Sequence, residues 1–345
     1  MVEKKIKHIP MLWRYLINAA LFLFFLFLIN KLIAVKIISY SYSKVLMLIC
    51  INIILAVSLN IATGYLGQLP LGHAGFMAVG AYSSALLLKS ISLPAFIAFP
   101  VGVLFGGIMA GIFGIMIGIP ALRLKGDYLA IITLGFGEII RVVLLNIDSV
   151  LGFPFTYGAA SLKGIPKNTT FFNAFVCVGI TCFVIHTMMK SRHGRAVLSI
   201  RENEIAAESC GISVTYYKTM GFAVSAFFAG VGGALYAGYL GILNPSSFGF
   251  MKSIEILVMV VLGGMGSMIG SVISATVLTA LPQFLLAFDR WRMVLYSLVL
   301  IAVMIFKPTG LMGTYDFSLS RLLERALGKL SGDSKSAGAG KGGTR

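Results

Sequence analysis

Residues 45–88 read VLMLICINIILAVSLNIATGYLGQLPLGHAGFMAVGAYSSALLL, and no Asp, Glu, Lys or Arg interrupts them. An α-helix of about 20 apolar residues crosses the ~30 Å hydrocarbon layer of a bilayer. The stretch is therefore long enough for two crossings. Further charge-free runs cover 15–30, 90–122, 168–189, 219–251, 256–288 and 293–306. This pattern predicts an all-α polytopic membrane protein, a helical bundle of about eight to ten spans.

The composition excludes other fold classes and several functions. Only 12% of the 345 residues are charged and 58% are hydrophobic, whereas a soluble domain carries about 25% charged residues. The net charge of +16 would suit a nucleic-acid binder only if the basic residues formed a stripe, and they do not. A transmembrane β-barrel needs short alternating strands, whereas residues 21–28 read LFLFFLFL. Because the basic residues form no stripe, we expect no nucleic-acid partner.

The N-terminal region allows two interpretations. Residues 1–14 carry four basic side chains ahead of the apolar run 16–29, an arrangement also typical of a secretory signal. No small-x-small cleavage site follows, so we interpret the run as an uncleaved first span, whose orientation the flanking charges leave open. The expected parts of the chain are 1–44 (N-terminal cytoplasmic segment and first span), 45–307 (transmembrane core) and 308–345 (cytoplasmic amphipathic helix and disordered tail).

Basic residues predict which loops are cytoplasmic. Lys and Arg near span ends stay on the inner side, and they gather in 190–218 and after 307. An even number of crossings must separate these segments, so the run 256–288 must start and end outside. Its middle, residues 263–267, reads GGMGS, which predicts a broken, re-entrant hairpin that enters from the outer side. Irregular backbone at that depth is tolerated only where it is buried in protein or lines a cavity.

A second break lies in residues 64–75, which read GYLGQLPLGHAG. Paired helix breaks in two halves of a chain indicate a transport pathway. His73 also has another interpretation, as a hydrogen-bonding partner for exposed backbone at the break. The candidate pathway residues are Gly64, Gly67, Gln68, Gly72, His73, Gly75, Glu138, Gly263, Gly264 and Gly266.

Glu138 lies in an apolar helix, where a charge at the bilayer centre costs roughly 2.5–3.5 kcal/mol. Arg141 follows three residues later, so the two side chains can neutralise each other on one helix face. A structural ion pair and a pathway role both remain open. Lys252 and Glu255 have the same spacing and are interpreted as a surface pair. No catalytic, disulfide or metal-binding arrangement follows from the spacing of the cysteines, histidines and carboxylates.

Small residues recur at helical spacing in two of the predicted spans. Glycines lie at 102, 106, 107, 111, 114 and 118, and the small residues of the second span are Ala226, Gly230, Ala234 and Gly238. Small side chains four apart let helix backbones approach closely in lipid. We interpret both series as packing seams.

The loop 190–218 contains more than a short connection needs. It includes a compact helix with Ala206 and Ala207 on a small face, charges around it and Gly211 in the C-cap role. Such a helix can insert into a groove on another protein, or it can lie along its own membrane surface. The residues alone leave both possibilities open.

The same loop resembles a known family. Ala206-Ala207-x3-Gly211 is similar to the Glu-Ala-Ala-x3-Gly coupling element of ABC-importer permeases, although Ile205 occupies the acidic position and Glu204 lies one residue early. The longer string 201–212 resembles the branched-chain amino acid permeases of the LivM type. Other stretches agree in family order, namely 63–76, 123–138, 263–267 and 307–311, while 152–157 departs from the family's usual turn.

This resemblance implies a transport subunit rather than an enzyme, one that moves branched-chain or related small amino acids into the cytoplasm across a bacterial inner membrane. The implied partners are a homologous LivH-like permease, two LivG- and LivF-like ATPases, an extracytoplasmic solute-binding protein and membrane lipid. ATP would bind to the ATPases, so no cofactor is expected in this chain. The residues implied in ATPase coupling are Arg201, Glu202, Glu204, Ala206, Ala207, Glu208 and Gly211.

Two alternative functions remain open. An ion-coupled secondary transporter would work alone, through Glu138 or Glu255. A permease of the same family would instead carry urea or short amides.

The C-terminal segment shows helical amphipathicity. Leucines at 319, 322, 323, 327 and 330 lie opposite the basic residues at 321, 325 and 329. This pattern predicts a helix on the cytoplasmic face, either bound to anionic lipid or packed on the ATPase.

Overall fold

The computed structural model describes residues 11–35, 39–91, 94–124, 126–152, 156–285, 291–307 and 310–311. The chain divides into two compact units, one formed by residues 1–37 and 315–345 and the other by residues 38–314. In the first unit the described element is helix α1 (Met11–Ala34). The predicted C-terminal amphipathic helix and tail lie outside the described residues.

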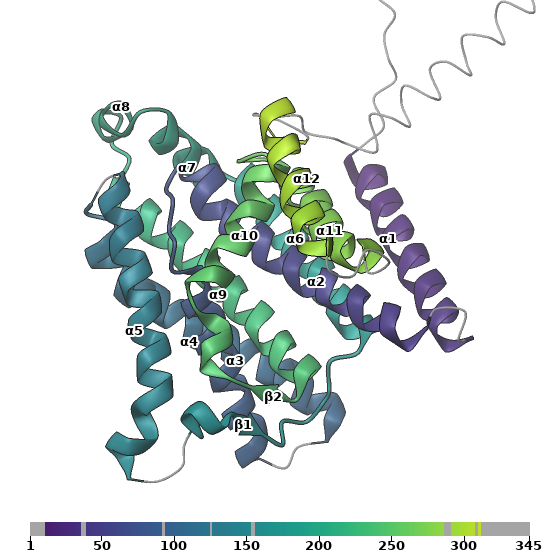
Figure 1. Ribbon diagram of the computed structural model, residues 1–345. Helices are drawn as coiled ribbons and strands as arrows, with labels where there is room; N and C mark the ends of the chain where they lie inside the picture. Colours follow the sequence, from purple (N-terminus) through teal and green to yellow (C-terminus); the bar gives the residue numbers. More distant parts are fainter. Residues whose placement is uncertain are drawn as a thin grey trace, which may run out of the picture. The chain divides into compact units, whose positions relative to one another are not determined.

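The second unit is a bundle of α-helices (Figure 1). A five-residue π-helix, Ile61–Tyr65, continues α2 directly, and short 3-10 turns cover Gly158–Ala160 and Pro245–Phe248. The α-helices are α2 (Tyr40–Asn60), α3 (His73–Ser90), α4 (Ala95–Ala121), α5 (Asp127–Leu151), α6 (Phe171–Lys190), α7 (Arg192–Glu202), α8 (Glu204–Ser209), α9 (Val214–Leu240), α10 (Phe250–Gly263), α11 (Met268–Phe284) and α12 (Arg292–Phe306).

Two short strands mark one end of this unit. Strand β1 (Leu162–Lys163) pairs antiparallel with β2 (Ile242–Leu243), with Leu162 opposite Leu243. Figure 1 shows α7 and α8 at the opposite end of the unit. These two ends are called the β end and the α7–α8 end below.

Six helices among the described residues are long and apolar enough to cross a membrane. They are Tyr40–Tyr65, Phe96–Ala121, Asp127–Val150, Phe171–Lys190, Val214–Leu240 and Pro245–Gly263. Helix α11 and residues Phe22–Ile33 are apolar but shorter. The predicted all-α polytopic fold is confirmed, and the predicted count of eight to ten spans is approximate because it depends on these shorter helices.

The core of the second unit is a close contact of α3, α4 and α9. A Cβ added at Gly230 in α9 would overlap Ala110 and the Gly106 carbonyl of α4, and one at Gly80 in α3 would overlap the Gly230 backbone. Backbones meet here because the residues are small. The predicted packing seams of α4 and α9 are confirmed.

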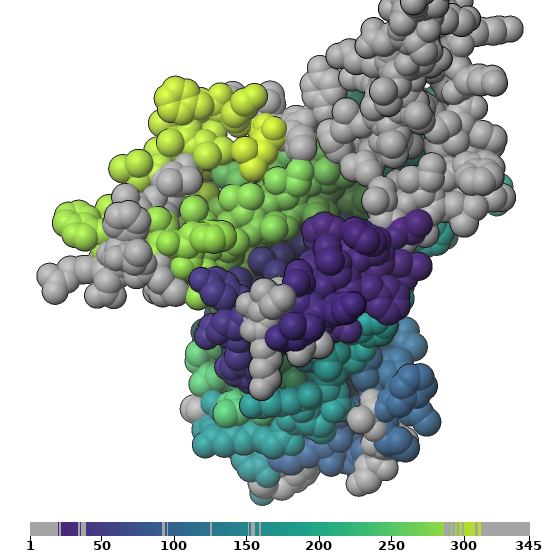
Figure 2. All heavy atoms as spheres, turned by 90° about the vertical axis from the view of Figure 1, so that its right-hand side faces the viewer, coloured from purple at the N-terminus to yellow at the C-terminus, as the bar shows by residue number. Residues whose placement is uncertain are grey.

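Burial differs sharply between helices. In the most apolar 18-residue window of α9, 72% of the residues are buried, against 11% in that of α5. In the view of Figure 2 the green-to-yellow residues of α11 and α12 lie on the surface at the upper left, and the blue-to-teal residues form the lower part. Helix α9 is therefore a central helix of this unit, together with the span Tyr40–Tyr65, whose corresponding window is 78% buried, and α5 is peripheral.

Helices α10 and α11 form the predicted hairpin. They cross at glycines, because a Cβ at Gly263 would overlap the Gly270 backbone and one at Gly270 would overlap the Gly263 carbonyl. Between the helices, Gly264 and Gly266 adopt positive φ values of 104° and 88°, which glycine tolerates far better than other residues. The sequence thus permits both the close crossing and the sharp turn.

We predict that substitutions Gly230→Ala and Gly135→Ala have opposite effects on stability. The added methyl at Gly230 meets α4, and overpacking of a core costs about 1–3 kcal/mol. Gly135 on α5 has no atom within 4 Å of its added Cβ, so alanine there should be neutral or slightly stabilising. Thermal unfolding of the purified full chain in detergent measures the effect of both substitutions on stability. Equal unfolding midpoints for the two variants would contradict the close packing of α9 on α4.

Candidate functional site

The segment between α6 and α9 forms two helices, each capped by a polar side chain. Ser191 is the N-cap of α7, and its hydroxyl accepts a hydrogen bond from the Gly194 amide at 3.4 Å. Asn203 ends α7 and begins α8, where its side-chain oxygen accepts from the Ala206 amide at 3.0 Å. Such caps satisfy amides that lack an intrahelical partner. The sequence singled out the second helix, and α7 is an addition to that prediction.

Helix α8 ends in a Schellman motif. The Gly211 amide donates to the Glu208 carbonyl at 2.9 Å, and the Ile212 amide donates to the Ala207 carbonyl at 3.1 Å. Gly211 has a φ of +80°, the left-handed conformation that this motif requires. The predicted C-cap role of Gly211 is confirmed, and α8 is a short helix with both ends fixed.

The two alanines of α8 lie on different sides. Ala206 is exposed, whereas Ala207 is buried with 4% of its surface accessible. Ile205 is 75% exposed and is the large apolar side chain on the outer side of α8. The expectation of a single small face made by both alanines is therefore wrong, because Ala207 packs into the chain itself. Ile205 and Ala206 are the exposed apolar residues of α8.

An ion pair joins α8 to the central helix α9. Lys218 Nζ lies 2.9 Å from Glu204 Oε1, and Lys218 is 4% exposed. Removing one partner of such a pair leaves a buried charge without compensation, which is strongly destabilising. The position of α8 is thus tied to the start of α9.

Arg201, at the end of α7, contacts both helix breaks. Its Nη1 donates a hydrogen bond to the Gly64 carbonyl at 2.7 Å. Cβ atoms added at Gly67 and Gly266 would lie 3.1 and 3.0 Å from the Arg201 side chain. A charged donor makes a stronger bond to a carbonyl than a neutral one does. The predicted coupling segment therefore reaches the predicted pathway residues through one side chain.

The two breaks also contact each other directly. The Asn60 side-chain oxygen accepts from the Gly266 amide at 2.9 Å. A Cβ at Gly64 would overlap both that oxygen and the Gly266 backbone. Gly64 and Gly266, predicted separately, are therefore neighbours. The turn of the α10–α11 hairpin lies beside Arg201, at the α7–α8 end.

The other end of the first break packs against α5. The Leu71 amide donates to the Thr133 hydroxyl at 3.0 Å. A Cβ at Gly72 would overlap the Thr133 carbonyl, and one at Gly75 would lie 2.9 Å from Gly137 Cα. Gly72 and Gly75 thus serve close packing of α3 on α5. Gln68, between these contacts, leaves its side-chain oxygen buried without a hydrogen-bond partner among the described residues.

His73 is buried within a polar cluster. It is 2% exposed, and its Nε2 lies 3.0 Å from the Ser58 hydroxyl. That hydroxyl donates its one proton to the Leu55 carbonyl at 2.8 Å, so it accepts from the histidine. Ser225 of α9 donates to the Ser58 carbonyl at 2.7 Å. His73 therefore joins helices through a side chain, not through exposed backbone of the break as one interpretation expected.

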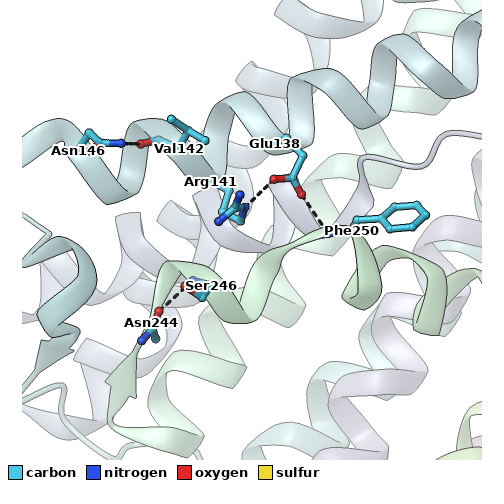
Figure 3. Close-up of polar contacts among 7 residues, drawn as sticks. All are labelled: Glu138, Arg141, Val142, Asn146, Asn244, Ser246 and Phe250. Carbon is cyan, nitrogen blue, oxygen red and sulfur yellow. Dashed lines mark hydrogen bonds and ion pairs between the residues drawn. The ribbon is translucent and has the colours of Figure 1, made fainter.

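Glu138 holds the start of α10 (Figure 3). One carboxylate oxygen lies 2.6 Å from Arg141 Nε, and the other accepts from the Phe250 amide at 3.1 Å. Both oxygens are engaged, and carboxylates are favourable at helix N-termini. The geometry matches the structural ion pair among the two open interpretations. The predicted pair of Lys252 and Glu255 is confirmed at 2.9 Å.

The predicted motif at 307–311 docks on the second break. Gly310, with a φ of +86°, lies so close to Gly264 that an added Cβ would overlap it. The Leu311 amide donates to the Leu262 carbonyl at 2.8 Å. The end of the core region therefore covers the turn that contains Gly263, Gly264 and Gly266.

Sequence reasoning missed three polar residues that organise this site. Asn60 and Thr133 lie inside apolar helices, and their side-chain oxygens accept hydrogen bonds from backbone amides of the two breaks. Lys218 was counted only as a loop charge, although it is buried against Glu204. A polar side chain in a span was the available signal, since it needs a hydrogen-bonding partner in lipid.

We predict that Glu138→Gln has a small effect on stability and uptake, whereas Glu138→Leu lowers both strongly. Glutamine keeps an acceptor for the Phe250 amide and loses only the bond to Arg141, whereas leucine loses both bonds and leaves the Phe250 amide unpaired as well, at a cost of about 1–3 kcal/mol. Thermal unfolding and solute uptake should therefore stay close to the parent for Glu138→Gln alone. Equal loss of uptake in both variants, at unchanged stability, would instead indicate a titrating carboxylate.

Comparison with known proteins agrees with this architecture. Residues 41–306 match the family described as "Branched-chain amino acid transport system / permease component". The chain is 36% identical over 296 residues to the high-affinity branched-chain amino acid transport system permease protein LivM of Escherichia coli K12, covering 76% of this chain and 68% of that protein.

Two further relatives are more distant. BraD of Pseudomonas aeruginosa is 25% identical over 279 residues (75% of this chain and 91% of BraD), and LivH of Salmonella typhimurium is 24% identical over 284 residues (75% and 90%). Both are high-affinity branched-chain amino acid transport system permease proteins. The matched region contains α2 through α12 and both helix breaks. The chain belongs to the family of branched-chain amino acid transport permease components.

Proposed function

We propose that this chain is the translocation subunit of an ATP-driven importer that carries branched-chain or related small amino acids into the cytoplasm. As a family member it is a multi-pass permease of the bacterial inner membrane and not an enzyme. The observation that carries the proposal is the α7–α8 segment, which offers an exposed partner surface and contacts both helix breaks.

The exposed side of α8 suits insertion into a groove. Ile205 supplies apolar area and Ala206 lets another backbone approach closely. Around them lie the exposed carboxylates Glu202 and Glu208. An apolar centre with a charged rim is the usual anatomy of a protein interface. We propose that this surface binds an ATPase subunit.

Two connections would transmit movement of α8 into the bundle. The Glu204–Lys218 pair links α8 to the central helix α9. The Arg201–Gly64 bond links the end of α7 to the first break, and Gly266 lies against the same arginine. A displacement of this segment would therefore act on α9 and on both breaks together.

The α7–α8 end would face the cytoplasm. Its exposed basic residues are Lys190, Arg192, Arg195 and Arg201, and such residues remain on the inner side. Since Leu311 contacts Leu262 near the same turn, the C-terminal segment would begin on the cytoplasmic side as well. The β end would then face the solute-binding protein.

The assembly would contain a permease pair, as the relatives LivM and LivH indicate. We propose a LivH-like second permease, two LivG- and LivF-like ATPases, an extracytoplasmic solute-binding protein and surrounding lipid as partners. ATP would bind to the ATPases, and this chain would need no cofactor of its own.

Reconstitution tests the proposed function. We expect ATP-dependent leucine uptake into proteoliposomes only when the permease pair, the ATPases and the solute-binding protein are all present. Urea and acetamide serve as competing solutes for the alternative substrates. Uptake driven by a proton or sodium gradient in liposomes that contain this chain alone would contradict the proposal and favour an ion-coupled transporter.

We predict that Ala206→Arg separates the chain from its ATPases. Arginine would place a large charged side chain on the exposed centre of α8, while Ala207 is unsuitable for this test because its burial would confound folding. The matched control is Ala160→Arg, at an exposed alanine near β1. Co-purification with the ATPases should be lost only in Ala206→Arg, and its retention together with normal uptake would contradict the coupling role.

A further inference from the structure

A cavity of about 300 Å³ lies at the α7–α8 end. It is bounded by the first break, by the turn between α4 and α5, and by the junction of α7 and α8. Its size is at the lower end of the range for small-molecule sites. It therefore suits a solute much smaller than a nucleotide.

Part of the cavity wall is aliphatic. The aliphatic residues that line it are Leu66, Leu69, Leu124, Leu129 and Ile200, and the accessible ones among them are Leu69 and Leu124. Burial of an aliphatic group against such a wall is favourable by about 25 cal/mol per Å² of apolar surface. The wall therefore favours a ligand with an aliphatic side chain.

The remaining wall carries charges of both signs. Arg201 lines it, and among the described residues its guanidinium makes a single hydrogen bond, to the Gly64 carbonyl. A guanidinium has five donors. Asp127 and Glu202 line it too, and their carboxylates make no hydrogen bond or ion pair with another described residue. The cavity thus offers donors for a carboxylate and acceptors for an ammonium group.

Gln68 gives an independent indication of a ligand. It lines the cavity, and its side-chain oxygen is buried without a hydrogen-bond partner among the described residues. A buried acceptor left unpaired costs about 1–3 kcal/mol. Rotation of this side chain toward the cavity would let a bound ammonium group satisfy the oxygen.

We propose that this cavity binds a zwitterionic amino acid with an aliphatic side chain from the cytoplasmic side. Arg201 would bind the carboxylate, Glu202, Asp127 and Gln68 would bind the ammonium group, and the leucine wall would hold the side chain. The inference rests on the proposed function for its orientation, because the ligand would be the imported product.

Occupancy would act on transport through Arg201. The same guanidinium bonds to Gly64 and touches Gly266, so a ligand carboxylate would stabilise the observed contact of α7 with both breaks. Any rearrangement that withdraws Arg201 would first have to release the ligand. Accumulated product would therefore slow further import.

Binding is measured on the full chain assembled with its second permease and ATPases in lipid nanodiscs, without the solute-binding protein. We expect saturable binding of tritiated leucine. The analogues 4-methylpentanoate, which lacks the ammonium group, and isoamylamine, which lacks the carboxylate, should compete about tenfold more weakly or worse. Equal competition by either analogue would overturn the zwitterion assignment.

Two substitutions test the location of the site. Glu202→Gln should weaken leucine binding about tenfold, because it removes a charge-assisted hydrogen bond. The matched control Glu255→Gln changes an exposed carboxylate on α10 that does not line the cavity, and this variant should bind leucine like the parent. Leu69→Trp should reduce leucine binding because the larger side chain fills the cavity. Since Leu69 is half-exposed, this substitution should not overpack the core.

The result separates this inference from the proposed function. Absence of saturable leucine binding to the parent complex up to about 10 mM, or binding unchanged in both Glu202→Gln and Leu69→Trp, overturns the cavity site. Leucine uptake by the reconstituted complex is a separate readout. Uptake without cavity binding overturns only this inference, whereas cavity binding without ATP-dependent uptake overturns only the proposed function.

Discussion

Helix breaks inside a membrane leave amides and carbonyls that lipid cannot satisfy, and the rest of this structure depends on how those groups are paired. Here they are paired by side chains from distant parts of the chain. Asn60 accepts from Gly266, Thr133 from Leu71, and Arg201 donates to Gly64. Because each bond crosses between helices, the breaks fix the tertiary structure instead of weakening it.

The use of Arg201 for one of these bonds has a mechanical result. Its backbone belongs to α7, outside the bundle of spanning helices, while its guanidinium reaches the first break and Gly266. A carbonyl of the first break is thus paired by the segment that carries the proposed partner surface. The buried Lys218, paired with Glu204, makes a second connection of the same kind to α9. Side chains therefore link α8 to α9 and α7 to the first break.

Residue patterns predicted the parts of this site and not their arrangement. Charge-free runs, glycine pairs and the Gly211 cap are local features, and each was confirmed in the described residues. The meeting of Gly64 with Gly266 was out of reach because the bond from Asn60 spans 206 residues. The burial of Ala207 could not be predicted for another reason. A helix of six residues is too short for its sequence pattern to show which face is buried.

The contrast in burial between α9 and α5 decides where the chain can be engineered. Most of α9 is enclosed, and Cβ atoms added at its Gly230 and Gly233 would overlap the backbones of α4 and α3. Much of α5 is open, and the added methyl at Gly135 would touch nothing. A combinatorial library confined to the outer face of α5 would retain the fold in most of its members, while the same library on α9 would be lost to misfolding before any selection began.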